Sequence, residues 1–486
     1  MRQIAGKNQL TLVECFCPFQ VVLLLSIANA DQKITHVLDR LSLGVRPGDR
    51  AQIQKQGVEA YIQSQVQSNS KSEPAGLANR LKALSTLSLS PLALFNPVNL
   101  PKNPSEEQQK KANQWRQQTF KEAWQARLMR AMESPYQLRE VMVDFWFNHF
   151  NVFAHNGMTI LWLSNYEDAA IRTHALGKFR DLLGATAKHP AMLFYLDNWR
   201  NTAPNSPGAK GPFQGLNENY ARELMELHTL GVDGGYSQAD VESLARTLTG
   251  WSMVHQAQPT TEESGFIFAA NRHDSSAKTL LGQALSGRGI EEGERALDLL
   301  SGHPSTANHI SYKLAQFFVA DTPPAGLVSR LADRFLESEG DIAQTLLALF
   351  NSDEFWDAKY YQRKFKTPYQ YVLSMVRAMG VTDPSQEVLT RLNGSMNQLG
   401  MPLYRCRTPD GYDQTENAWL SPDVMMRRVS MAITVTHVVR GSKPEPSQLL
   451  ETLGAQMTGE ERQLIANAPN HLKASLMLGS PSMMYR

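Results

Sequence analysis

The hydrophobic positions of this 486-residue chain recur at the spacing of amphipathic helices over most of its length. Residues 106–132 predict a long polar helix with solvated charged and glutamine-rich faces, whereas residues 141–153 are dense in aromatic and apolar side chains and are expected in the core. Residues 32–66 predict two helices around a turn rich in glycine and proline. Further helices are predicted at 164–176, 179–187, within 216–250, and at 292–301, 305–320, 324–338, 341–350, 368–379, 385–399, 420–439 and 457–479.

Only a short part of the chain alternates as a β-strand does. Residues 251–254 and 265–270 predict a hairpin, and residues 279–281 are a candidate addition to it. We therefore expect a mainly α fold, a large multi-helix globular domain with a minor β-hairpin element. The length allows one helical domain, about 31–480, or two lobes. The lobes would be about 31–198 and 216–440, joined by the loop 199–215 and followed by a helical tail, 441–486.

The loop 199–215 is rich in proline and glycine and directly precedes a polar helix at 216–231. Such a loop can cover a site, or it can be a plain surface insertion. Both interpretations fit the sequence.

Composition narrows the class of protein. The hydrophobic content is 42% and the formal net charge is +1, and the mean hydropathy is −0.35. These values are typical of a globular protein and do not indicate a nucleic-acid footprint or a polybasic membrane attachment. No run of 18 apolar residues follows residue 30, so no integral membrane segment is expected there.

The N-terminus has the pattern of a signal peptide. An apolar run at 21–27 follows basic residues and ends at Ala28-Asn29-Ala30, a small-x-small cleavage pattern. We expect cleavage near Ala30 and a periplasmic or secreted protein. The alternative is a buried N-terminal helix or strand, which Glu14 and Pro18 favour.

Cysteine chemistry is limited in such a mature chain. Cys15 and Cys17 lie in the predicted leader, which leaves Cys406 alone. An intramolecular disulfide and a zinc site built from cysteines are therefore not expected. The chain also lacks HExxH, GxSxG, Walker A and GxGxxG motifs.

The polar helix 216–231 is the most unusual segment. Asn219, Arg222, Glu223 and Glu226 recur at spacings of three and four, so their side chains can converge on one face. Two carboxylates within a turn can bind a divalent cation or divide acid and base roles. The alternative is an exposed salt-bridged face, which contributes about 0.2–0.5 kcal/mol per pair. His228 lies in the last turn, where the helix dipole favours a cation and the ring can bond the terminal carbonyls. The alternative is that it is a metal ligand.

Other polar residues occur in settings that resemble motifs. Asp144 and His149 lie in the aromatic helix, where each needs a partner if it is buried, either in a site or as a structural pair. His273 is next to Asp274 after the predicted hairpin. His303 precedes a helix for which the pattern predicts a cap at Ser305 or Thr306.

Long stretches of the chain resemble a bacterial family known as domain of unknown function 1800, over about residues 34–440. The strongest resemblance is at 215–238, which contains Asn217, Glu218, Arg222, Glu223 and Glu226. The other matching stretches are 36–41 with 46–49, 141–153, 189–198, 268–274, 303–307 with Lys313-Leu314, and 366–368. The resemblance implies export and a gene neighbourhood shared with a sulfatase-like exported family. It supplies no reaction or catalytic residue.

Two hypotheses follow. The first is an exported hydrolase or lyase that acts on an envelope or extracellular polymer such as a glycan or sulfated polysaccharide, with a divalent metal as a possible cofactor. The second is a non-catalytic export or assembly partner of the sulfatase-like protein. Under the first hypothesis Glu223 and Glu226 are acid, base or metal ligands, His149 or His273 is a base, and Arg222 binds an anion. The additional candidates are Asp144 as a metal ligand, and Asn217, Glu218, Asn219 and His303 as polar site residues.

Overall fold

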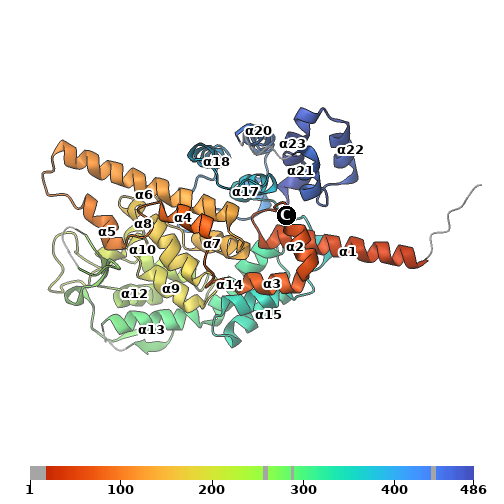
Figure 1. Ribbon diagram of the computed structural model, residues 1–486. Coiled ribbons are helices and arrows are strands. Elements are labelled where there is room, and N and C mark those ends of the chain that lie inside the picture. The colour runs from red at the N-terminus through yellow and green to blue at the C-terminus, as the bar shows by residue number, and fades with distance from the viewer. Residues whose placement is uncertain (1–17, 256–260, 286–288, 439–444) are drawn as a thin grey trace, which may run out of the picture.

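The computed structural model describes residues 18–255, 261–285, 289–438 and 445–486, and it confirms the mainly α fold (Figure 1). The longer helices are α1 Pro18–Leu41, α2 Asp49–Gln56, α3 Val58–Val66, α4 Ala75–Lys82, α6 Glu106–Glu133, α7 Gln137–His149, α8 Thr159–Asn165, α9 Phe179–Ala187, α10 Pro190–Tyr195, α12 Gln238–Thr247, α13 Ile290–Ser301, α14 Pro304–Phe318, α15 Ala325–Glu337, α16 Ile342–Phe350, α17 Pro368–Ala378, α18 Gln386–Gln398, α20 Pro422–Val438, α21 Pro446–Leu453, α22 Gly459–Asn467 and α23 Asn470–Leu478. The shorter helices are α5 Pro91–Phe95, η1 Asn96–Val98, η2 Tyr166–Ile171, η3 Arg172–His174, η4 Asn198–Arg200, α11 Asn219–Glu223, η5 Leu224–His228, η6 Ala270–Arg272, η7 Ala358–Tyr360, α19 Glu416–Trp419 and α24 Pro481–Met484.

Local sequence signals determine where several helices begin and end. α6 begins after Ser105, whose hydroxyl accepts from the Gln108 backbone in a capping box. Gly57, with φ of 87°, separates α2 from α3, so the second helix predicted in 32–66 is two helices. The helix predicted at 457–479 is also two, α22 and α23, because Ala468-Pro469 interrupts it.

The predicted hairpin is present as β1 Trp251–Met253 and β2 Phe266–Phe268, with Ser252 opposite Ile267. The candidate addition forms a separate hairpin instead. β3 Lys278–Leu280 pairs with β4 Gln283–Leu285. Leu281 and Gly282 join them with φ of 51° and 76°, the left-handed conformation that a two-residue turn needs to match strand twist.

Two helices lie at the centre of the packing. α7 is buried at nearly every residue and contacts α1, α3 and α6. α17 is buried throughout and packs against α6, α18, α20, α21 and α24. α17 therefore connects the C-terminal helices, gathered at one end of Figure 1, to the rest of the molecule. The buried hydrophobic side chains form one cluster that extends from Ile34 to Met484.

The predicted leader, residues 1–30, falls largely outside the part of the chain whose side chains are described. Across the described residues, no helix has both the length and the apolar character needed to cross a bilayer.

Candidate functional site

The segment predicted as one polar helix is shorter and less regular in the structure. It begins at Asn219, continues as α11 to Glu223, and then widens into the π-helical turn η5. Thr229 caps this turn with its hydroxyl, which donates to the Leu224 carbonyl at 2.6 Å. Gly231 closes it with φ of 86°. A π-turn changes the direction in which the last carbonyls point, and such turns often occur at functional sites.

The widened turn brings the His228 carbonyl to His149 at the end of α7. His149 Nε2 lies 3.1 Å from the His228 carbonyl oxygen, which can only accept, so Nε2 carries the ring proton. His149 Nδ1 is then an acceptor, and the Lys313 ammonium donates to it at 2.9 Å. A neutral histidine and a lysine thus form a hydrogen-bonded pair, the Lys313–His149 pair.

Burial keeps the histidines of the Lys313–His149 pair and its surroundings uncharged. Burial lowers the pKa of His228 to about 3 and, with Lys313 nearby, the pKa of His309 to about 4. The pKa of His149 also lies well below its usual value, chiefly through burial and next through Lys313. Burial lowers the pKa of Lys313 to about 8, and Asp410 opposes that shift. His228 is therefore uncharged, and its prediction as a helix-terminal cation is wrong.

The charge of the predicted carboxylate Glu226 acts on the predicted carboxylate Glu223, and so does the charge of Asp410 from a distant loop. Glu223 and Glu226 are partly exposed on α11 and η5. Burial raises the pKa of Glu223, and the charges of Glu226 and Asp410 raise it further. Because Asp410 acts on both Glu223 and Lys313, these two groups share one electrostatic neighbourhood.

The loop that carries Asp410 is held against the end of α7. Asn148 donates from its side chain to the Tyr412 carbonyl at 2.8 Å and accepts from the Tyr412 N–H at 2.8 Å. Gly411 has φ of 78°, and a Cβ there would lie 2.2 Å from the Asn148 carbonyl oxygen. Only glycine allows this approach, which places Asp410 next to the turn that ends in His149.

Arg222, which was predicted to bind an anion, is paired with neighbouring side chains in the structure. Its Nη2 donates to Glu218 at 3.0 Å and to Gln238 at 2.9 Å, and these groups are exposed or partly exposed. This is the salt-bridged helix face that the spacing allowed as the alternative. Asn219 donates to the Leu196 carbonyl at 3.2 Å, and Asn217 accepts from the Asn219 N–H at 3.0 Å, so both fix the start of α11.

His273 belongs to a second centre with other partners. Its Nε2 lies 3.1 Å from Glu292, which also binds Lys278 at 2.9 Å. The side chains of Lys278 and Glu292 are 0% exposed. His273 Nδ1 lies 2.9 Å from the Thr249 carbonyl. None of these partners is shared with His149, whose own partners are Lys313, the His228 carbonyl and the rings around α7.

Asp144 is also placed away from the Lys313–His149 pair. It accepts from Arg127 at 2.6 Å, and Arg127 donates to Glu167 at 3.1 Å. Tyr404 adds a bond to the same Glu167 oxygen at 2.8 Å. This network is buried and bonded, so it connects α6, α7 and η2 as a structural unit.

His303 is itself the helix cap, in place of Ser305 or Thr306. Its ring accepts from the Ser305 N–H at 3.1 Å, and Pro304 begins α14. His189 does the same before Pro190, accepting from the Ala191 N–H at 3.1 Å. A His-Pro pair thus caps two helices by one geometry.

Metal ligands were predicted among Glu223, Glu226, His149, His273 and Asp144. Within the residues that the structure describes, no group of three or more His, Cys, Asp or Glu side chains is arranged to hold a metal ion. Glu226 and Asp410 both act on Glu223, and Asp410 also acts on Lys313, the hydrogen-bond partner of His149. His273 and Asp144 lie in separate networks.

The loop 199–215 is fastened to the segment after the first hairpin. The Ala203 and Gly208 N–H groups donate to the carbonyls of Arg272 and Asn271 at 2.8 and 2.9 Å. The Arg272 guanidinium lies 4.1 Å from the centre of the buried Phe213 ring. These contacts hold the loop at three points along its length.

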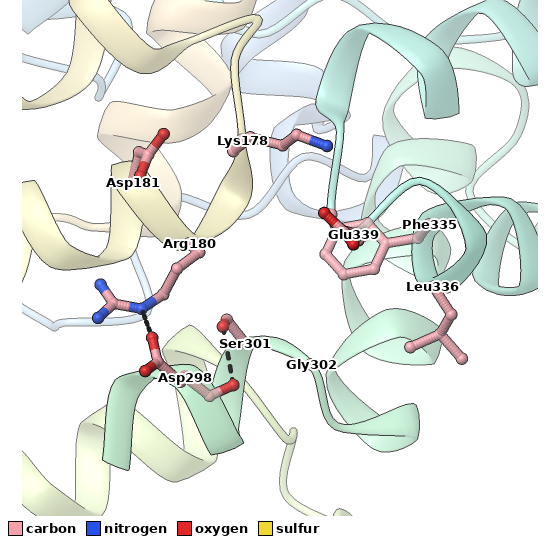
Figure 2. Close-up of a pocket in the computed structure, with 10 residues that line it drawn as sticks. Lys178, Arg180, Asp181, Asp298, Ser301, Gly302, Phe335, Leu336 and Glu339 are labelled. Carbon is pink, nitrogen blue, oxygen red and sulfur yellow. Dashed lines mark hydrogen bonds and ion pairs between the residues drawn. The ribbon is translucent and has the colours of Figure 1, made fainter. Parts of the chain in front are cut away.

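A cavity of about 410 Å³ opens between α9, α13 and the end of α15 (Figure 2). Arg180 crosses it to Asp298 at 2.6 Å, and Phe335 and Leu336 form its apolar side. None of the residues predicted for a site lines this cavity.

Sequence reasoning assigned no role to Lys313 or Asp410. Lys313 lay within a stretch that resembled the family, but a single lysine on a helix has no local signature. Asp410 lies in a Pro-Asp-Gly turn, which predicts loop structure only.

Comparison with known proteins adds one finding. The model of a family described as "Protein of unknown function (DUF1800)" matches residues 36–485. The match therefore extends past the 34–440 region of the resembling motifs and includes most of the C-terminal helices. Neither the curated proteins nor the solved structures give a match.

Proposed function

We propose that this chain, which belongs to the family described as "Protein of unknown function (DUF1800)", is an acid–base hydrolase of an envelope or extracellular glycan, with Glu223 as its general acid. The observation that carries the proposal is the state of Glu223. It is a partly exposed carboxyl whose pKa is raised by burial and by two neighbouring carboxylates. A carboxyl in such surroundings keeps its proton closer to neutral pH and can donate it to a leaving oxygen.

The neighbouring groups suit the remaining steps. Hydrolysis of a glycosidic bond needs a second carboxylate, which activates water or stabilises the positive charge that develops on the sugar. Glu226 and Asp410 are the carboxylates whose charges act on Glu223. The Lys313–His149 pair supplies a second proton-exchanging group, because a lysine with a pKa of about 8 gains and loses its proton near neutral pH.

The charge around the site narrows the substrate class. Glu223, Glu226 and Asp410 make the exposed side acidic, and Arg222 is already paired with Glu218. A sulfated polymer would be repelled by this arrangement, so an uncharged glycan is the better substrate. The apolar run and the Ala28-Asn29-Ala30 pattern support action outside the cytoplasm.

The test is to incubate the protein with purified polysaccharides, some uncharged and some sulfated. The rate of hydrolysis is measured from the reducing ends that are released. Glu223→Gln is expected to lower the rate of hydrolysis about 100-fold or more. The melting temperature is expected to stay unchanged, because the variant removes a carboxylate that Glu226 and Asp410 repel. Glu218→Gln is the matched control on the same segment and is expected to retain the rate. If no glycan is cleaved, or if both variants have equal rates, the proposal fails.

A further inference from the structure

A second group of buried charged residues is a cluster of cations inside the molecule. It consists of Arg40 on α1, Lys364 and Lys366 before α17, Arg428 on α20, and Arg486. These residues are between 0% and 3% exposed. Their charges act on one another: Arg486 lowers the pKa of Arg40, Lys364 and Lys366 in addition to the larger effect of burial.

The acids in this region are too few to balance the cations. Lys364 pairs with Asp321, and Asp39 accepts from Gln456. Burial raises the pKa of Asp39 to about 6, although Lys366, Arg40 and other cations oppose the shift. Asp144 also acts on Arg486, but it is itself bonded to Arg127. Even if Asp144 and a terminal carboxylate at Arg486 are both counted, five cations face four anions. Uncompensated buried charges cost several kcal/mol each in effective terms.

Arg40 and Arg486 are held side by side at the C-terminal end of α14. Arg40 Nη2 donates to the Tyr360 carbonyl at 2.6 Å and lies 3.4 Å from the Val319 carbonyl oxygen. Arg486 Nη2 donates to the Phe317 carbonyl at 2.9 Å, and its guanidinium lies over the Phe317 ring. The carbonyls at a helix end favour cations, which explains why the arginines dock there.

The other N–H groups of these arginines lack acceptors. Arg40 Nε and Nη1 and Arg486 Nε are buried without a hydrogen-bond partner among the described residues. Buried polar groups in folded proteins are nearly always bonded, and charged donors are the most costly to leave unbonded. A water molecule could accept from them, but it would leave the excess of positive charge in place.

We propose that a small inorganic anion, a halide or an oxyanion such as phosphate, binds between Arg40 and Arg486 as a buried structural ion. It would accept from the free guanidinium N–H groups and balance the cations near the end of α14. It would also join α1 to Arg486, residues at opposite ends of the matched region. This inference does not depend on the proposed hydrolase activity.

The test uses the full chain transferred into gluconate buffer at constant ionic strength. Chloride, bromide or phosphate then replaces gluconate stepwise while the melting temperature is measured. A saturable rise of about 2–5 °C is expected for the ion that binds. Arg40→Met, or Arg486→Met if the first variant does not fold, should lose this response. Arg427→Met is the matched control, because Arg427 is exposed and paired with Asp423 on α20.

Crystals soaked in bromide give a direct second measurement, an anomalous peak between the two guanidinium groups. The proposal is overturned if no anion gives a saturable response, if Arg40→Met and Arg486→Met respond as the native chain does, or if crystals grown in each anion contain only water there.

Discussion

Among the residues that the structure describes, two lysine–histidine centres differ in burial and in what neutralises the lysine. Lys278 donates to the carbonyls of Asp274 and Ser276 and forms an ion pair with Glu292. His273 lies against the same carboxylate. Lys313 donates to the neutral ring of His149, and the carboxylate that acts on it, Asp410, lies on an exposed loop.

This difference distinguishes a lysine charge that stabilises the fold from one that can take part in proton transfer. The Lys278 ammonium is buried and paired, so it stabilises the fold around the hairpins and keeps its proton. The Lys313 ammonium faces a neutral acceptor and has a lowered pKa, about 8. The carboxylate that acts on it, Asp410, also raises the pKa of Glu223. Such opposed shifts are typical of functional sites. The same substitution at both lysines tests this distinction.

Lys278→Met is expected to have the largest effect. It leaves the Glu292 carboxylate buried without its ammonium partner, which should cost about 3–5 kcal/mol of the free energy of unfolding. Urea denaturation measures this loss, and Lys359→Met, at an exposed lysine, is the control. A loss below about 1 kcal/mol would mean that the Lys278 centre is no more structural than the Lys313 pair.

Lys313→Met is expected to leave the free energy of unfolding unchanged or higher, because a lysine that is costly to charge is removed. Under the proposed function it should lower the rate of glycan hydrolysis about 100-fold. Tyr312→Phe, on the exposed side of α14, is the control and should retain the rate. If Lys313→Met lowers the free energy of unfolding as much as Lys278→Met does, both lysines are structural. The distinction drawn between the two centres is then wrong.

The pH dependence of stability gives the smallest effect. The pKa of Lys313 is about 8 in the folded chain and 10.5 in its ordinary state, so between these values the unfolded chain binds more protons. The charged Lys313 therefore lowers the free energy of unfolding by its full amount below pH 8. This destabilisation decreases as the pH rises towards 10. The advantage in melting temperature of Lys313→Met over the native chain should shrink over that range, as scanning calorimetry can measure. A constant difference would show that the pKa of Lys313 is not lowered.

The sequence predicted most of the fold because its signals are local. The Ser105 cap, the apolar spacing of α7 and the alternation of β1 and β2 each depend on a few neighbouring residues. Where the prediction differed, a single residue interrupted the pattern, as Gly57 and Pro469 do. The π-turn η5 could not be predicted, because it has the same composition as an α-helix.

The site could be predicted only in part. Glu223 and Glu226 were found because two carboxylates one turn apart are visible in the sequence. Lys313 and Asp410 were not found, because their meaning depends on contacts between α7, α14 and a distant loop. His273 and His149 looked equivalent in the sequence, and both are buried, but their hydrogen-bond and ion-pair partners distinguish them.

The two His-Pro caps contribute to the way the protein responds to acid. Burial lowers the pKa of His189 to about 3, and it also lowers the pKa of His303. At pH 5 the His189 ring therefore stays unprotonated and still accepts from the Ala191 N–H. The unfolded chain takes up protons at both histidines below pH 6.5, so the free energy of unfolding falls as the pH drops. Mild acid thus weakens the fold by favouring the unfolded chain, while the start of α10 keeps its geometry.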